Sequence, residues 1–326
     1  MIERTIAPEV AEVFIGLARG RRGLYRDDDQ LEQLIADAKA ALETADPETV
    51  EIIRRFARAE VPDGGVLFHG LLVDQEQMGE SPRNAADFEE KDRDPVTEAA
   101  LLAFAAAAGE VFAFARQHRG QIVQNVTPVP GHEYDAVGTG SRSLLDWHSE
   151  DAFDDAHPQF VGLFCVRGDE RVQTALAPVD RIALSDEDEA VLRQPRFMHG
   201  IDKASGGTGR PEDGVQGAAL YGDDGKRFVR IDTDCAAAVA GDEEAAAALQ
   251  RFHDGADAEG VYVTLGAGDI LLFDNRRVMH ARTPFEPRYD GTDRWLQRVI
   301  ITDDLGRSEG RRSVRPRVVE NELLNA

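Results

Sequence analysis

The sequence has very few cysteines and no long apolar run. Only Cys165 and Cys235 are present, each within or beside an apolar stretch, which argues against a disulfide framework and for a reducing compartment. The first residues contain no apolar signal core, and the longest apolar stretch, 99–115, is rich in alanine and includes Glu110. We therefore expect a soluble cytoplasmic protein without a membrane segment.

Basic residues are scarce relative to acidic ones. Lys and Arg number 37 against 61 Asp and Glu, so the formal net charge is −24. A field of this sign repels phosphate backbones and anionic membrane surfaces, so we expect neither nucleic acid nor a membrane as a partner. An acidic surface is also the ordinary route to solubility, and net charge alone therefore identifies no substrate.

The first 120 residues predict a mainly helical scaffold. Apolar residues recur at helical spacing between residues 31 and 38. Asp-Pro pairs at 46–47 and 94–95 are typical of an N-cap followed by the first helical position. The second of these helices is expected to continue through the alanine-rich segment towards Arg116. Short strands are predicted at 66–68 and 71–73.

Beyond Gly120 the sequence favours β-structure. Short runs of β-branched and aromatic residues alternate with Gly, Pro and Asp, which is typical of an antiparallel sandwich or jelly roll. One more helix is expected at 242–253, and the glycine-rich stretch 204–214 predicts a mobile loop over the barrel. Strands are predicted at 121–126, 160–166, 228–231, 261–265, 270–273 and 294–302.

The chain has no internal repeat and no linker that would justify a division. We expect one domain over residues 1–326, of β-rich α+β class. Its parts are a helical scaffold (1–120), a jelly-roll core with an inserted helix and a lid loop (121–305), and a C-terminal tail (306–326).

A histidine and a carboxylate two residues apart suggest a metal site. His148 and Glu150 would leave the same face of an extended strand and could chelate one ion, although chance alone gives about one or two such pairs in this composition. A second segment strengthens the case, because His280 follows a buried-looking strand and the turn Asp274-Asn275. Two histidines and one carboxylate form the facial triad of non-haem iron(II) oxygenases. Zinc prefers a closed tetrahedral site, so it fits less well but stays an alternative.

Two arginines lie on the last predicted strand. Arg294 and Arg298 are four residues apart, so they share one face at a separation of ~13 Å. Guanidinium groups bind carboxylates bidentately, and at this spacing the two could serve two different carboxylates. For each arginine, a salt bridge at the strand edge is an equal alternative.

These segments resemble those of the clavaminate synthase-like iron(II)/2-oxoglutarate oxygenases. The segment 148–153, HSEDAF, with His157-Pro158 after it, is similar to that family's metal-binding segment. The segment 274–282, DNRRVMHAR, is similar to the one that carries the distal histidine and leads to the co-substrate arginine. Residues 124–131 resemble the strand and loop before the metal site. The resemblance covers about residues 120–305.

The resemblance implies a double-stranded β-helix, which is a jelly-roll core wrapped by N-terminal helices. It also implies that 2-oxoglutarate and dioxygen are consumed to hydroxylate a substrate, with release of succinate and CO2. Arg294, helped by Thr174, would bind the distal carboxylate of 2-oxoglutarate, and Arg298 would face the substrate carboxylate. Halogenating relatives lack the carboxylate ligand, so Glu150 favours hydroxylation. The iron(II) ligands would be His148, Glu150 and His280.

Within this family the chain is most similar to hydroxylases of free basic amino acids. Asp232 and Asp234 lie where those enzymes hold the cationic side chain and could face the cavity together; exposed turn carboxylates are the alternative. Asp202 matches a lid aspartate, but Lys203 stands where those relatives have glutamate. Gln124 matches a substrate-contacting glutamine, and Glu150 would also border the substrate.

We therefore expect hydroxylation of a free basic L-amino acid at C3, with L-arginine first, then L-lysine or a close analogue. A neutral or cyclic amino acid such as asparagine or enduracididine is the first alternative, with Asp232 and Asp234 facing solvent. A non-catalytic jelly-roll binding protein or a zinc hydrolase is the second. The only partner expected is a small amino acid. The sequence decides neither the exact substrate nor the oligomeric state.

Overall fold

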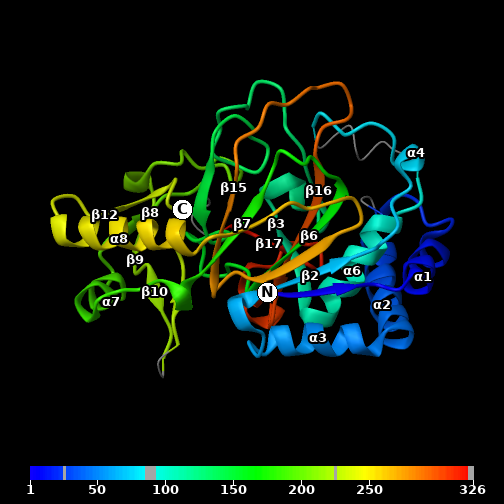
Figure 1. Ribbon diagram of the computed structural model, residues 1–326, viewed down its shortest axis with the longest axis horizontal. Helices are drawn as coiled ribbons and strands as arrows, with labels where there is room; N and C mark the ends of the chain where they lie inside the picture. Colours follow the sequence, from blue (N-terminus) through cyan, green and yellow to red (C-terminus); the bar gives the residue numbers. More distant parts are fainter. Residues whose placement is uncertain (25–26, 85–92, 224–225, 322–326) are drawn as a thin grey trace.

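A sheet of eight strands runs through the middle of the protein (Figure 1). The computed structural model describes residues 1–24, 27–84, 93–223 and 226–321. Within these ranges the strand order is β1-β2-β14-β6-β16-β3-β17, and β4 pairs with β16. The strands are β1 (Ile2–Thr5), β2 (Gly65–His69), β3 (Glu110–Phe114), β4 (Gln124–Val126), β6 (Phe160–Arg167), β14 (Ile270–Asp274), β16 (Trp295–Thr302) and β17 (Val318–Val319).

A second sheet carries two of the three residues that are expected to bind metal. Its four strands are ordered β13-β7-β15-β5 and pair antiparallel. Across this sheet His280 is paired with His148, and Arg282 is paired with Thr174. The register thus brings together residues that are far apart in the chain. The strands are β5 (Leu145–His148), β7 (Thr174–Pro178), β13 (Val261–Val263) and β15 (Val278–Arg282).

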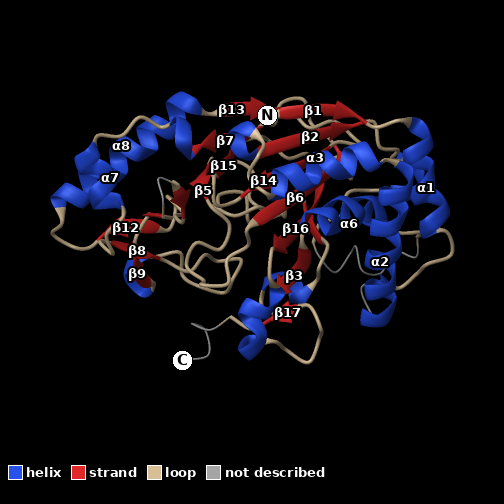
Figure 2. Ribbon diagram, turned by 90° about the horizontal axis from the view of Figure 1, so that it is seen from below, coloured by secondary structure: helices blue, strands red, loops and turns tan. Residues whose placement is uncertain are grey.

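Helices cover the larger sheet at one end of the molecule and flank a small three-stranded sheet at the other (Figure 2). The alanine-rich helix α6 packs against α1, α2, α3, β6 and β16. Helix α3 begins as expected, because the Asp46 side chain accepts a hydrogen bond from the backbone N–H of Thr49 (3.0 Å) and Pro47 follows it. The helices are α1 (Pro8–Ala18), α2 (Asp28–Ala45), α3 (Pro47–Ala57), α4 (Gln75–Met78), α6 (Val96–Ala108), α7 (Asp186–Leu192) and α8 (Glu243–Glu259).

Short elements fill the region around α7 and α8. Helix α8 confirms the helix expected at 242–253 and extends it to Glu259. Among the described residues no helix combines the length and the apolar character needed to cross a membrane. The two small sheets are β12-β8-β9 and β10-β11, formed by β8 (Phe197–His199), β9 (Val215–Gly217), β10 (Leu220–Tyr221), β11 (Phe228–Val229) and β12 (Ala236–Ala238). The 3-10 helices are η2 (Pro62–Gly64), η3 (Gln117–Gly120), η4 (Val179–Arg181), η5 (Pro211–Asp213) and η6 (Leu305–Arg311).

The helix predicted to run towards Arg116 ends at Ala108, so this prediction is wrong at its C-terminal end. The chain passes closely over β16 at Gly109, where an added Cβ atom would lie 2.4 Å from the carbonyl oxygen of Thr302. Residues 110–114 then form β3, and all but the first are buried. In a strand that is buried on both faces, apolar and polar residues do not alternate. The sequence of residues 110–114 therefore gave the same pattern as a continuation of the preceding helix.

Two further sequence predictions need correction. Residues 71–73 form no strand, because only the N–H of Leu71 reaches a neighbouring backbone, donating to Gly268 O (3.1 Å), and Leu72 is exposed. The expected C-terminal tail is packed structure as far as it is described, since β17 pairs with β3 and Arg311 holds Asp154 through two hydrogen bonds of 2.8 and 2.6 Å. Residues 322–326 of that tail lie outside the described residues.

Candidate active site

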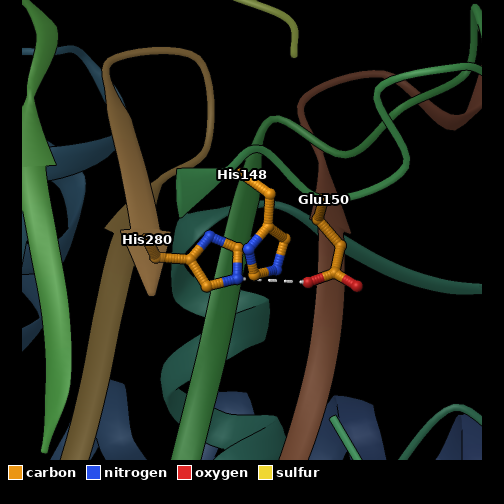
Figure 3. A group of neighbouring side chains, drawn as sticks. All are labelled: His148, Glu150 and His280. Carbon is orange, nitrogen blue, oxygen red and sulfur yellow. Dashed lines mark ion pairs between the residues drawn. The ribbon is translucent and has the colours of Figure 1, made fainter. Parts of the chain in front are cut away.

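Three side chains, two on neighbouring strands and one in the turn after β5, converge on one point (Figure 3). His148 ends β5, Glu150 follows it in the next turn, and His280 lies opposite on β15. One ligand atom from each lies within 4.8 Å of the others, and His280 Nε2 is 3.5 Å from Glu150 Oε2. The two imidazole centroids are 3.9 Å apart. Three donors that approach from one side match the facial triad expected from the sequence.

Hydrogen bonds from outside the triad orient two of its members. The Nδ1–H of His148 donates to the carbonyl oxygen of Asp146 (2.7 Å), which leaves Nε2 available to a metal. The amide of Asn275 holds the Glu150 backbone from both sides, accepting from its N–H (2.7 Å) and donating to its carbonyl (3.2 Å). Asn275 also donates to Pro158 O (2.9 Å). The sequence placed Asn275 in a turn but gave no sign of this positioning role.

Glu150 and His280 carry the charge states that metal ligands need. Burial alone would raise the pKa of Glu150, but Arg298 and His280 outweigh it, so the pKa lies below its ordinary value. Burial and the nearby His148 lower the pKa of His280 to about 4. A carboxylate and a neutral imidazole are the forms that bind a divalent cation. This donor set of two nitrogens and one oxygen fits iron(II).

Most of the predicted site residues line one cavity beside the triad. They are Thr174, Asp202, Asp232, Arg294 and Arg298, in addition to His148, Glu150 and His280. Burial raises the pKa of Asp232 to about 6 and raises that of Asp202. The Oδ1 atom of Asp202 accepts a hydrogen bond from the N–H of Ser205 (2.6 Å). Gln124 and Asp234 are the two predicted residues outside the lining.

The expected cavity pair of Asp232 and Asp234 is not formed. Asp234 is exposed, and its Oδ2 accepts a hydrogen bond from the N–H of Asp146 (3.0 Å). The prediction assumed that side chains two residues apart share a face, which holds only in an extended strand. Residues 233–235 form a turn, so the two carboxylates point to different surroundings.

Arg294 is a buried guanidinium whose Nη2 donates to Thr174 Oγ1 (3.1 Å). It forms no ion pair within the described part of the chain, and burial lowers its pKa. Arg282 lies nearby but donates to the carbonyl oxygens of Gly140 and Ser143. A buried cation without a counter-charge is costly, so this end of the cavity suits an anionic ligand group.

Arg298 also lines the cavity and has several partners. Its Nε donates to Gln124 Oε1 (3.0 Å), its Nη1 forms an ion pair with Glu150, and its Nη2 donates to Gln117 Oε1 (3.4 Å). Gln124 is fully buried behind it. The sequence predicted neither the contact with the metal ligand nor that with Gln117.

Two cavity residues were missed by the sequence reasoning. Asp151 is buried with φ = 55°, and burial and Glu150 raise its pKa well above the ordinary value. Gln117 donates to Asp151 Oδ1, while Asp151 Oδ2 has no hydrogen-bond partner among the residues that the structure describes. Asp151 lies inside the recognised motif and could have been found there. Gln117 lies in η3, and no pattern marks it.

Gln117 also ties the predicted lid segment to the core. Its Nε2 donates to Ser205 Oγ (2.8 Å), and Ser205 is fully buried. On the outer side Lys203 pairs with Asp135 (2.6 Å). The residue after Asp202 thus faces away from the cavity. Mobility of this segment stays a prediction.

Comparison with known proteins agrees with this site. Residues 216–300 match the model of the taurine catabolism dioxygenase TauD, TfdA family. The chain is 37% identical over 265 residues to L-asparagine oxygenase of Streptomyces coelicolor, covering 80% of this chain and 77% of that protein. It is 33% identical over 294 residues to enduracididine β-hydroxylase of Streptomyces hygroscopicus (80% and 84% covered). It is 29% identical over 317 residues to an L-ornithine/L-arginine 3-hydroxylase of Catenulispora acidiphila (90% and 91%).

Solved structures match over nearly the whole length. The non-haem iron oxygenase OrfP in complex with Fe and α-ketoglutaric acid superposes with a TM-score of 0.86 at 30% identity, covering 97% of this chain and 99% of that one. OrfP with Fe, succinate and (3S)-hydroxy-L-Arg gives 0.88 at 28% identity (98% and 100%). Iron and 2-oxoglutarate therefore belong to this site. The chain is a member of the clavaminate synthase-like iron(II)/2-oxoglutarate-dependent oxygenases that hydroxylate amino acids.

Proposed function

We propose that this oxygenase hydroxylates a free L-amino acid with a cationic side chain, first L-arginine, then L-lysine or a close analogue, at C3. One observation carries the proposal. Asp151, Asp202 and Asp232 line the catalytic cavity, and in the described part of the chain none of them forms an ion pair with a basic side chain. The guanidinium of Arg298 pairs with Glu150 instead.

Buried carboxylates without a counter-ion are unfavourable, and the raised pKa values of these three groups express that cost. Proteins usually place a cation beside such a cluster. A guanidinium or ammonium group brought by the substrate would remove the desolvation penalty when it binds, and a neutral side chain would not. The cavity therefore favours a basic amino acid.

The remaining groups would fix the reacting carbon. Iron(II) and 2-oxoglutarate supply the activation of dioxygen, and the protein supplies orientation. We assign iron to His148, Glu150 and His280. Arg294 with Thr174 would bind the distal carboxylate of 2-oxoglutarate, and Arg298 with Gln124 would bind the α-carboxylate of the substrate. Holding the α-carboxylate at one end and the cationic group at Asp202 and Asp232 would leave the β-carbon between them.

The comparisons support this assignment and a more specific fold. The relatives include an arginine 3-hydroxylase, and OrfP was solved with (3S)-hydroxy-L-Arg. Both concern C3 of a basic amino acid. We also propose that the eight-stranded and four-stranded sheets are the two halves of a double-stranded β-helix, and that residues 1–326 form one domain. The coverage of 97–98% of this chain by OrfP supports both.

A neutral or cyclic substrate is the competing proposal. The 37% identity to L-asparagine oxygenase favours it, and asparagine is also hydroxylated at C3 in the product complex of a structural neighbour. In that case an amide would donate hydrogen bonds to the cavity carboxylates without neutralising them. The two proposals differ in whether the side chain must carry charge.

A competition assay separates them. The iron(II)-loaded enzyme would receive 2-oxoglutarate, dioxygen and an equimolar mixture of arginine, lysine, ornithine, citrulline, asparagine, glutamine and enduracididine. Mass spectrometry then detects the gain of one oxygen. Citrulline is the matched control, because it has the shape of arginine without its charge. We expect hydroxylated arginine or lysine and little hydroxylated citrulline. Preferential consumption of asparagine, or equal consumption of citrulline and arginine, would reject the basic substrate.

A further inference from the structure

A second cavity of about 290 Å³ lies near the catalytic one and shares no lining residue with it. Its polar groups come from distant parts of the chain. His199 lies on β8, Arg230 follows β11, and Asp155 belongs to the segment after the metal ligand Glu150. Neither the family resemblance nor the catalytic cycle uses His199 or Arg230.

His199 is a buried histidine whose side chain forms no hydrogen bond within the described part of the chain. Only 3% of the residue is exposed, and neither ring nitrogen has a partner among the described residues. The backbone of Gly217 and Ala218 lies beside the ring, but burial and Arg230 dominate and lower the pKa of His199 to about 4. The ring is therefore a neutral donor and acceptor. Buried polar atoms in native proteins nearly always have a partner, which can be a ligand or an ordered water.

Arg230 presents a free edge in the same cavity. Its Nε donates to Ala152 O (2.5 Å) and its Nη1 to Asp155 Oδ1 (2.8 Å), while no hydrogen bond occupies Nη2 within the described chain. The other acidic group of the lining, Asp154, is neutralised by the two hydrogen bonds from Arg311. The unsatisfied donors are thus a guanidinium N–H and an imidazole N–H, which together suit the two oxygens of a carboxylate.

We propose that this cavity is a second ligand site, which binds a small carboxylate between Arg230 and His199. The carboxylate can belong to a simple organic acid or to a free amino acid. In the second case the ammonium group would find Asp155, whose side chain is 83% exposed and uses only Oδ1 towards Arg230.

Two chain segments run from the lining of one cavity to the lining of the other. Residues 150–151 line the catalytic cavity, and residues 153–155 line the second one. Arg230 faces the second cavity, whereas Asp232, two residues later, faces the first. The N–H of Ser149 donates to Ile231 O (2.7 Å) and ties the two segments together. A bound carboxylate would therefore contact residues that lie close in the chain to the metal ligand Glu150 and to Asp232, the aspartate proposed to bind the side chain of the substrate.

Binding of radiolabelled acetate tests the proposal. Equilibrium dialysis would use the iron(II)-loaded enzyme under anaerobic conditions with saturating 2-oxoglutarate, so that Arg294 is occupied. We expect one acetate equivalent whose affinity falls at least tenfold in His199→Phe and in Arg230→Met. His69→Phe is the matched control, because His69 lies on β2 outside both cavities, and it should bind as the wild type does. Circular dichroism would verify that each variant is folded.

The outcomes are distinct. Equal acetate binding in wild type, His199→Phe and Arg230→Met would place the acetate elsewhere and overturn the proposal. The absence of saturable binding would also overturn it, because only ordered water would then occupy the cavity. Glycine as a second probe distinguishes the two sources. Tighter binding of glycine than of acetate, lost in Asp155→Asn, supports a free amino acid as ligand, and equal binding supports a simple organic acid. None of these results depends on which amino acid is hydroxylated.

Discussion

Replacing Asp232 by asparagine should remove the selectivity for a charged substrate. The substitution keeps the shape of the side chain and deletes one negative charge from the wall of the catalytic cavity, where none of the described basic residues pairs with it. A hydrogen bond between charged groups contributes about 1.5–3 kcal/mol. Its loss should lower kcat/KM for arginine by about ten- to a hundredfold, because this parameter follows transition-state binding. Citrulline, which has no charge to lose, should be affected far less.

Asp234→Asn is the control, since Asp234 is exposed two residues further along and bonds to the backbone of Asp146. A change at such a site is usually within ~0.5 kcal/mol, so kcat/KM should move by less than about threefold. Both variants would be assayed with arginine and citrulline in competition, with mass spectrometric detection of the products. Turnover of 2-oxoglutarate without substrate should be unchanged in both. Equal losses in the two variants, or an undiminished preference for arginine in Asp232→Asn, would refute the reasoning.

Three further predictions address the rest of the site. Arg294→Ala should raise the KM for 2-oxoglutarate at least tenfold and leave the KM for the amino acid nearly unchanged, because Thr174 is the only described side-chain partner of Arg294. Succinate release measures both constants, and an unchanged KM for 2-oxoglutarate would contradict this prediction. Gln117→Ala should remove the hydrogen bond to the buried Ser205, and hydrogen exchange of the backbone amides of residues 202–206 should therefore increase, as should the amount of succinate released per hydroxylated product. Unaltered amide exchange would show that Gln117 does not hold the lid. Burial and Arg230 lower the pKa of His157 to about 4, so between about pH 6.5 and pH 4 the unfolded chain takes up a proton that the folded chain does not. The free energy of unfolding should therefore fall by up to ~3 kcal/mol as the pH decreases through that window. In chemical denaturation, the free energy of unfolding of His157→Gln should depend less steeply on pH than that of the wild type, and an equal dependence would contradict the assignment.

The sequence was sufficient where a function depends on a short, fixed constellation. His148 and Glu150 lie two apart at a strand end, and His280 follows a buried strand, so the pattern predicts the triad that the sheet register then assembles. The family resemblance predicted a shared role for Arg294 and Thr174, and the structure places these two side chains in hydrogen-bond contact. Such residues are recognisable because the chemistry restricts both their types and their spacing.

The sequence failed where geometry depends on distant packing. Asp232 and Asp234 share the spacing of a strand face, but a hydrogen bond from Asp146 holds Asp234 in a turn outside the cavity. Gly109 ends a helix because the backbone of Thr302 lies against it, and these two residues are far apart in the sequence. Gln117 connects three other segments through side-chain hydrogen bonds to Asp151, Ser205 and Arg298. No local pattern encodes contacts of this kind.

The measurement that tests the account most directly is the iron content of the triad variants. Wild type, His148→Ala, His280→Ala and the control His69→Phe would be loaded anaerobically with iron(II), dialysed and analysed for bound metal, with circular dichroism as a check on folding. We predict about one iron per chain in wild type and control, and loss of both iron and succinate release in folded His148→Ala and His280→Ala. Full iron content and full activity in either of these variants would contradict the assignment of His148, Glu150 and His280 as the metal site.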